Sequence, residues 1–533
     1  MQADLIIRNG HVVDGTGAAA FDADVVVLDG KIELVGDAAG FEAAVDWDAA
    51  GKTVCPGFID IHSHSDFTLV ANRNAESGVR QGITTVVTGN CGHGPAPAPH
   101  KELAKGNTLG FNDSWGLDFS WNSFADYLEV LFSPGVAINT APLVPHGTVR
   151  LAVMGYADGL PNKRELANMK ALVAEAMAAG AAGLSTGLEY SPGQYADEHE
   201  LIELSRVAAK YGRIYASHIR NRGDTFVEAA GEAVNIAREA GLAAQLSHLA
   251  PRPYASPNAF GQVLELIYKA RDEEGMEIGI DTFPDQWGPG PVVAMLPPWV
   301  YEGPREQILE NLHDSAVAEQ CRAYIDSPDN YLLRLGGFEK FFLTYSKAHP
   351  ELIGKSFAEI ARHFRLDNAD TIFKLVLDDG DDFYNVMLRH VYATEADLNR
   401  LLQQPICSLE SDGAFAATYG TLSEFVMNRS SYCYTVRFLE EYVREKKLFS
   451  LEEAIRKMTS LPADSAKLGN RGRVAVGGAA DLLVIDLGSI SDASSDAQPQ
   501  AHPQGIELVI VNGQVVLRDG KHTGALPGQR LPH

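Results

Sequence analysis

The sequence predicts an α/β protein built around a (β/α)₈ barrel of the TIM type, with a small β-sandwich domain formed by both chain termini and a helical insertion near the eighth strand. Three observations support this fold class. Between residues 55 and 464, short apolar runs alternate with helical periodicity, the pattern of parallel strands joined by helices. Both chain ends contain strand-like runs, and residues 286–404 are too long for one connection within a barrel.

The length of the chain agrees with more than one domain. Its 533 residues exceed the roughly 250 to 300 residues at which a single core stops growing. We predict a β-sandwich domain from residues 1–54 and 465–533, and a barrel domain from residues 55–464. Residues 286–404 begin with a Pro- and Gly-rich stretch and then become largely helical, so we expect an inserted lid over the barrel mouth.

The composition excludes several classes of partner. A hydrophobic share of 45% and a charged share of 21% are typical of soluble globular proteins, and no apolar run approaches the about 18 residues of a membrane span. The net charge of −26 argues against nucleic acid and anionic membranes as partners. Five cysteines are too few for a disulfide framework, and the first residues lack a secretory signal, so we expect a cytoplasmic protein.

The small β domain is predicted from turn signals between apolar runs. An Asn-Gly pair divides residues 4–13 and an Asp-Gly pair divides residues 24–32, and both dipeptides favour β-hairpins. Strand-like runs recur at 480–486 and 506–517. Because neither chain end can bury a good core alone, we expect the two ends to pair into one β-sandwich.

The barrel is predicted from eight runs of strand character, separated by helix-prone segments such as 163–179, 225–240 and 257–274. The predicted strands are Gly57–His62, Ile83–Thr88, Val136–Val144, Gly183–Gly187, Ile214–His218, Ala243–Leu249, Glu277–Phe283 and Pro405–Glu410. In such barrels, chemistry gathers at the carboxyl ends of the strands.

Side chains that can bind a metal follow five of these strands. His62 and His64 are two residues apart at the end of the first strand, where alternate residues point to the same side. The other donors, after the second, fifth, sixth and eighth strands, are Cys91, His218, His248 and Asp412. Imidazole, thiolate and carboxylate ligands together suit Zn²⁺, and a catalytic zinc keeps one position open for water.

Each donor also has a structural explanation. The His-Ser-His stretch fits a surface turn, Cys91 a buried apolar residue, His218 and His248 hydrogen-bonded core histidines, and Asp412 the N-cap of a helix. Chance does not readily explain all six donors in this order, so we predict a catalytic zinc site. Zinc lowers the pKa of its bound water to about 7, and Asp412 is the predicted proton acceptor.

Five longer stretches identify a family resemblance. They are 56–66 (PGFIDIHSHSD), 82–92 (GITTVVTGNCG), 183–193 (GLSTGLEYSPG), 218–224 (HIRNRGD) and 411–413 (SDG). With these motifs the chain resembles the amidohydrolase superfamily, and in particular its N-acyl-D-amino-acid deacylase (D-aminoacylase) branch. The resemblance runs nearly end to end, and it implies a metal-dependent hydrolase of linear amide bonds.

The resemblance also implies how the donors divide. In such enzymes the tight zinc ion is held by the cysteine and by the histidines of the fifth and sixth strands, here Cys91, His218 and His248. A thiolate can stand where related hydrolases use a carbamylated lysine. Residues 183–187 contain no lysine, which counts against the cyclic-amide hydrolases.

The other three donors are implied to form a second metal position that is weaker or empty. They are His62, His64 and Asp412. Asp412 is implied to work as general acid and general base. Tyr190 resembles a family tyrosine near the reacting carbonyl, where it would donate a hydrogen bond to the developing oxyanion and contact the substrate. Alternatively, Tyr190 is an aromatic side chain that only packs against its neighbours.

Further substrate contacts are implied for three residues. His146 follows the third strand and resembles a residue that supports the site, and Arg220 belongs to the 218–224 motif. Arg252 can stand in for a family lysine at the position of Ala250.

The sequence departs from the family at three places where such enzymes engage a carboxylate or amide of the substrate. Ala250 replaces the lysine, Phe283 begins Phe-Pro-Asp in place of Tyr-Pro-Tyr, and the usual Pro-Arg after 411–413 is missing. We therefore expect a linear amide substrate more firmly than an N-acyl-D-amino acid. The alternatives are an N-substituted formamide deformylase, a cyclic-amide hydrolase, a deaminase and a non-catalytic assembly protein. Arg220 and Asn221 stand where deaminases usually carry a glutamate, and the oligomeric state is left open.

Overall fold

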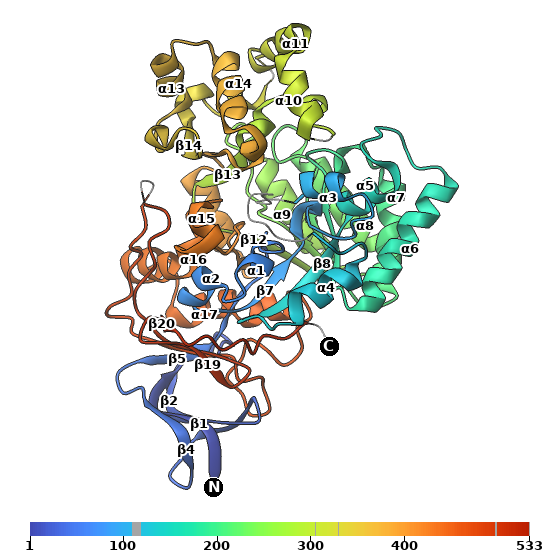
Figure 1. The fold of residues 1–533 in the computed structure, drawn as a ribbon. Helices are drawn as coiled ribbons and strands as arrows, with labels where there is room; N and C mark the ends of the chain where they lie inside the picture. Colours follow the sequence, from blue (N-terminus) through green and yellow to red (C-terminus); the bar gives the residue numbers. More distant parts are fainter. Residues whose placement is uncertain (109–118, 304, 329, 496–497, 532–533) are drawn as a thin grey trace.

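The computed structural model describes residues 1–108, 119–303, 305–328, 330–495 and 498–531. Its centre is a barrel of eight parallel strands in sequence order, which confirms the predicted fold class (Figure 1). The strands are β6 (Phe58–Asp60), β7 (Ile83–Thr88), β8 (Asn139–Pro145), β9 (Gly183–Gly187), β10 (Ile214–His218), β11 (Ala244–Leu246), β12 (Ile278–Thr282) and β16 (Cys407–Leu409). Every residue of these strands is buried, as parallel strands covered on both faces require.

The first and last strands of the barrel meet through the residues that follow them. Ser63 and Gly413 form an isolated parallel bridge, and the His64 backbone N–H donates to the Gly413 carbonyl at 2.7 Å. The Asp412 backbone N–H donates to the His62 carbonyl at 3.2 Å. The ring therefore closes at the predicted metal ligands, just beyond the ends of β6 and β16.

Helices cover the outside of the barrel. The predicted helical segments correspond to α6 (Lys163–Ala179), α8 (Phe226–Ala240) and α9 (Ala259–Asp272). The other helices around the barrel are α1 (Thr68–Ala71), α2 (Glu76–Arg80), α3 (Lys101–Gly106), α4 (Phe124–Phe132), α5 (His146–Met154), α7 (Glu198–Ala209), α15 (Glu395–Leu402), α16 (Ser430–Arg437), α17 (Leu451–Met458) and α18 (Ser460–Ser465). α6 shows how the sequence sets their ends, because Asn162 and Glu165 form a capping box and Gly180 ends the helix at φ 104°.

Both chain ends pair into one β unit, as predicted. Its strands are β1 (Gln2–Val12), β2 (Phe21–Leu28), β3 (Lys31–Gly36), β4 (Glu42–Asp48), β5 (Thr53–Pro56), β17 (Leu482–Ile485), β18 (Ile506–Val511), β19 (Gln514–Arg518) and β20 (Lys521–His522). They form one branched sheet in which β5 pairs with both β1 and β17, so it joins the two ends of the chain. Apolar side chains from both ends, including Leu5, Val25 and Leu482, share one core.

The Asn-Gly pair at 9–10 does not form the predicted hairpin. β1 continues through it with a register shift between Ile7 and Gly10, and Asn9 adopts φ 57°. A Cβ at Gly10 would lie 2.4 Å from Val54 Cγ2, so the glycine allows close approach of β5. The dipeptide serves a bulge rather than a turn. The Asp-Gly pair at 29–30 does form the β2–β3 turn, with positive φ at both residues.

The insertion lies at the opposite end of the barrel from the small β unit (Figure 1). It contains a three-stranded sheet and five helices within the described residues: β13 (Trp287–Pro291), β14 (Phe341–Tyr345), β15 (Met387–Val391), α10 (Arg305–His313), α11 (Ser315–Ile325), α12 (Tyr331–Arg334), α13 (Phe357–Phe364) and α14 (Asn368–Asp379). These elements share a separate apolar core. α15 buries Leu398, Leu401 and Leu402 in the barrel core, so we propose that the insertion ends before Glu395.

None of the helices in the described ranges combines the length and the apolar character needed to cross a bilayer.

Candidate metal centre and substrate cavity

The structure brings all six predicted metal ligands to one rim of the barrel, in two groups that share Cys91. In the first group, Cys91 Sγ lies 3.7 Å from His218 Nδ1 and 3.5 Å from His248 Nε2. Cys91 follows β7, His218 is the last residue of β10, and His248 follows β11. β10 and β11 are neighbours in the barrel, and two strands separate β7 from β10. The side chains are buried, so the donor atoms face one another and not bulk water.

The second group adds the two histidines of the first strand and the aspartate of the last. Cys91 Sγ lies 3.2 Å from His62 Nε2, and Asp412 Oδ1 lies 3.6 Å from His62 Nε2 and 3.3 Å from His64 Nε2. Within each group the donor atoms lie within 4.8 Å of one another. Buried thiol and imidazole donors and a partly exposed carboxylate at this spacing fit a zinc ion in the first group and a second metal in the other.

Three ligand residues adopt backbone conformations that are rare for residues other than glycine. The φ angles of Cys91, His248 and Asp412 are 56°, 36° and 42°. Such conformations cost of order 1 to 3 kcal/mol each and persist where the surroundings enforce them. At Cys91 the surroundings include Gly92, where a Cβ would lie 2.8 Å from the Gly187 backbone nitrogen. Three of the six predicted metal ligands therefore lie at strained backbone positions.

A carboxylate that the sequence prediction missed orients His218. Glu189 Oε2 accepts a hydrogen bond from His218 Nε2 at 2.8 Å, and Glu189 Oε1 pairs with Arg252 Nη2 at 2.8 Å. Burial alone would raise the pKa of Glu189, but Arg252 and His218 hold it well below its usual range. The ionised Glu189 fixes the tautomer of His218 that presents Nδ1 to the metal position. The sequence feature that could have identified Glu189 is its place in the 183–193 motif.

His248 is positioned by a second missed carboxylate, on β12. The His248 backbone N–H donates to Asp281 Oδ1 at 2.6 Å, and Gln245 Nε2 donates to Asp281 Oδ2 at 2.7 Å. Asp60 has a similar role where the first and last strands of the barrel meet. Its Oδ1 accepts hydrogen bonds from the backbone N–H groups of Ser411 and His62 at 3.1 and 3.3 Å. Burial raises the pKa of both aspartates to about 7. Asp281 and Asp60 therefore position the backbone of the residues that carry the metal-binding side chains.

Asp412 is a carboxylate at neutral pH. Burial by itself would raise its pKa, but the hydrogen bond from His64 and the charges of His62, His64 and His218 lower it to about 2. The unprotonated group can therefore accept a proton.

Tyr190 lines the same cavity as the metal ligands. Its hydroxyl donates to the Cys91 carbonyl at 2.8 Å, and its ring stacks on His93 at a centroid distance of 4.7 Å. In this structure the tyrosine braces the Cys91 turn. A contact with the substrate stays a prediction.

Two predicted substrate-binding residues lie outside the cavity lining. Arg220 pairs with Glu232 at 2.8 Å and donates to the carbonyls of Gln194 and Ala196 at 2.8 and 2.9 Å. His146 is fully buried, and its Nε2 lies 2.8 Å from Glu200 Oε1. Their side chains are occupied by other protein groups, so these positions do not support direct contact with the substrate.

The buried group of His146, Arg150 and Glu200 predicts a stability effect. We expect Glu200→Ala to destabilise the protein by about 3 to 5 kcal/mol, because it leaves the buried Arg150 charge uncompensated. The matched control is Glu203→Ala on the same helix, whose partly exposed pairs are worth about 0 to 1 kcal/mol. Denaturant unfolding and zinc content measure both. Equal losses from the two variants would contradict a special role for the buried group.

The cavity above the ligands has a volume of about 590 Å³ and is roofed by the insertion. The insertion contributes mainly tyrosines and apolar side chains, among them Tyr301, Tyr331, Tyr384, Leu296 and Leu388. The contacts between the insertion and the barrel include two hydrogen bonds of 2.6 Å, from Arg334 Nη2 to Asp224 Oδ1 and from the Tyr195 hydroxyl to Glu302 Oε1. Residues of the insertion thus line the same cavity as the predicted metal ligands.

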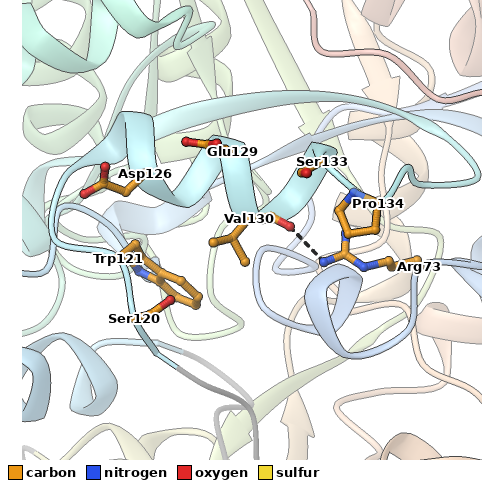
Figure 2. A pocket seen from close by; sticks show the side chains of 8 residues that line it. All are labelled: Arg73, Ser120, Trp121, Asp126, Glu129, Val130, Ser133 and Pro134. Carbon is orange, nitrogen blue, oxygen red and sulfur yellow. Dashed lines mark hydrogen bonds between the residues drawn. The ribbon is translucent and has the colours of Figure 1, made fainter.

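A second hollow of about 440 Å³ lies beside α4, where Arg73 Nη2 donates to the Val130 carbonyl at 2.8 Å (Figure 2). Trp121, Asp126 and Glu129 contribute to its wall. Its lining includes none of the six metal ligands. The cavity under the insertion is therefore the candidate active site.

A barrel with these donors at the carboxyl ends of its strands has the arrangement of a metal-dependent enzyme of the (β/α)₈ class. The chain belongs to the amidohydrolase family, whose sequence profile matches residues 47–248 and 357–517. The predicted superfamily is thus confirmed. The profile leaves out 249–356, which includes much of the insertion.

Relatives and solved structures show which amidohydrolases the chain is similar to. The chain is 33% identical to N-acyl-D-glutamate deacylase of Alcaligenes xylosoxydans xylosoxydans over 96% of this chain and 93% of that one. It is 31% identical to D-aminoacylase of the same organism, over 99% of this chain and 97% of that one. A crystal structure of D-aminoacylase matches with a TM-score of 0.81 at 30% identity, and covers both chains fully. N-acyl-D-glutamate deacylase from Bordetella bronchiseptica, complexed with zinc and a phosphonate inhibitor, matches with a TM-score of 0.82 at 30% identity and the same coverage. The two relatives from Alcaligenes are named as a deacylase and an aminoacylase, and the predicted enzyme class is confirmed.

Proposed function

We propose that this protein is a zinc-dependent deacylase of N-acyl-D-amino acids. The observation that carries the proposal is the convergence of Cys91, His218 and His248 on one point of the barrel rim, with the carboxylate of Asp412 beside Cys91. The substrate class is supported by relatives named N-acyl-D-glutamate deacylase, N-acyl-D-aspartate deacylase and D-aminoacylase.

The proposed mechanism assigns proton transfer to Asp412. Zinc supplies a Lewis acid that polarises the substrate carbonyl and lowers the pKa of water. Asp412 accepts the proton of the attacking water and returns it to the departing nitrogen, so the amide bond is replaced by a carboxylic acid and an amine. Glu189 and Asp281 hold His218 and His248 in place during both steps.

The proposal also covers the substrate contacts, a second metal and the location of the protein. Tyr190 and Arg252 line the cavity and are proposed to contact the substrate. The second donor group would hold a weaker metal, and a D-aminoacylase structure is described as having a binuclear metal centre. We propose a small-molecule amide as the partner and the cytoplasm as the location, since all five cysteines are free and buried.

The test is a hydrolysis panel with zinc measured on the same sample. Paired N-acetyl-D- and N-acetyl-L-amino acids are compared with N-formyl amides, hydantoin and adenine. We expect hydrolysis of N-acetyl-D-amino acids, loss of activity with a chelator, and recovery on addition of zinc. Zinc-loaded protein that hydrolyses only formamides, hydantoin or adenine would favour one of the alternative reactions, and hydrolysis of none would refute the deacylase.

A further inference from the structure

Arg222 is a buried cation without a carboxylate partner in the part of the chain that the structure describes. The residue is 5% exposed. Its Nη1 donates to the His248 carbonyl at 3.1 Å, its guanidinium lies 5.0 Å from the Tyr392 ring centroid, and its Nε makes no hydrogen bond. A buried charge of this kind is costly unless an opposite charge compensates it.

The position of Arg222 shows where that charge would come from. Arg222 lines the same cavity as Cys91, His218 and His248. Its carbonyl accepts the Arg252 backbone N–H at 2.8 Å, so the loops that follow β10 and β11 lie side by side above the metal position. The pKa of His248 is lowered by burial, by neighbouring His218 and by the charge of Arg222.

The other arginines of the cavity already have carboxylate partners. Arg252 pairs with Glu189, and Arg334 pairs with Asp224. The acidic residues of the lining are Glu189, Asp224 and Asp412, and Asp412 is engaged by the histidines of the second group. No carboxylate of the described lining is left for Arg222. Glu189 is near enough for the Arg222 charge to contribute to its lowered pKa, but its two oxygens are held by His218 and Arg252. A carboxylate that pairs directly with Arg222 would therefore come with a ligand.

We propose that Arg222 binds the free carboxylate of the substrate and thereby determines specificity for an N-acyl amino acid over a neutral amide. This inference rests on the proposed function and adds the residue that recognises the anion. Ala250 and Phe283, where the sequence departs from the family pattern, are buried apolar side chains and cannot supply a charge. The Arg222 guanidinium supplies the positive charge instead, through charge-assisted hydrogen bonds to the substrate carboxylate.

The experiment compares N-acetyl-D-methionine with its neutral carboxamide, N-acetyl-D-methioninamide. Both kcat/KM and zinc content are measured for wild type, Arg222→Met and Arg222→Lys. The matched control is Arg220→Met, two residues earlier, whose guanidinium is held by Glu232 outside the cavity. Equilibrium binding of both probes is measured by calorimetry in an Asp412→Asn background, so that recognition is read without turnover.

We expect Arg222→Met to lower kcat/KM and affinity for the carboxylate probe by about 10- to 100-fold, mainly through KM, with little change for the carboxamide. Arg222→Lys should recover part of the preference, and Arg220→Met should keep the wild-type ratio of the two probes. Equal losses for both probes, with reduced zinc content, would mean that Arg222 only supports His248, and would overturn the proposal. A wild type that does not distinguish the probes would overturn it as well. Arg222-dependent binding of the carboxylate without hydrolysis would refute the deacylase function and retain the anion site.

Discussion

Replacing Asp412 with asparagine is expected to lower kcat by about 10²- to 10⁴-fold while the tight zinc stays bound. Asparagine keeps the shape and can still accept a hydrogen bond from His64, but it cannot take the proton of the attacking water. Cys91, His218 and His248, the group that fits the tight zinc, do not include Asp412. Steady-state kinetics on N-acetyl-D-amino acids and zinc content per chain measure the two effects separately.

The matched variant is Asp281→Asn, which changes a carboxylate that contacts His248 and Gln245 and does not line the cavity. Asp281 accepts the His248 backbone N–H, so its loss should weaken zinc affinity, by about 10- to 100-fold, and restore most of the rate at high zinc. Added zinc should not restore Asp412→Asn. An Asp412→Asn enzyme with full zinc content and the wild-type rate would exclude Asp412 as the proton acceptor.

Replacing Cys91 with alanine is expected to remove the tight zinc and to lower kcat/KM by more than about 10³-fold. Cys91 belongs to both donor groups, and its sulfur lies within 3.7 Å of a nitrogen of His62, His218 and His248. Without the thiolate, the first group retains only two imidazoles, too few for a catalytic zinc site with three protein ligands. Metal analysis after dialysis against a weak chelator measures the loss.

Cys407→Ala is the control for this variant. Cys407 is also a buried free cysteine of the barrel, on β16, but it belongs to neither donor group. It should keep its zinc and its activity and lose only packing energy. Wild-type zinc content in Cys91→Ala would show that the metal is held elsewhere, and it would remove the basis of the proposed mechanism.

The barrel was predictable because its signals are local. Each of the eight strands overlaps its predicted segment, since a parallel strand between two layers of helices needs a continuous apolar run. The six donors were predictable for a related reason: they follow strand ends, and strand ends of a parallel barrel share one rim. The chemistry of the donors then pointed to zinc.

Other features depended on contacts between distant residues. The Asn-Gly pair at 9–10 has the composition of a hairpin, and the approach of Val54 makes it a bulge. α15 has the periodicity of an ordinary helix, and only its packing assigns it to the barrel and not to the insertion. Such choices are made by the packing surface, which local propensity does not describe.

The sequence by itself determined the barrel, the position of the donors along the chain and the kind of metal they suit, because hydrophobic period and ligand chemistry belong to short segments. Only the tertiary structure decided which charged side chains line the cavity. Arg220 and Arg222 are two residues apart, yet Glu232 neutralises the first while the second faces the cavity without a carboxylate partner among the described residues. The charge that a buried side chain presents depends on its neighbours in space, and those neighbours come from helices and loops far away in the chain.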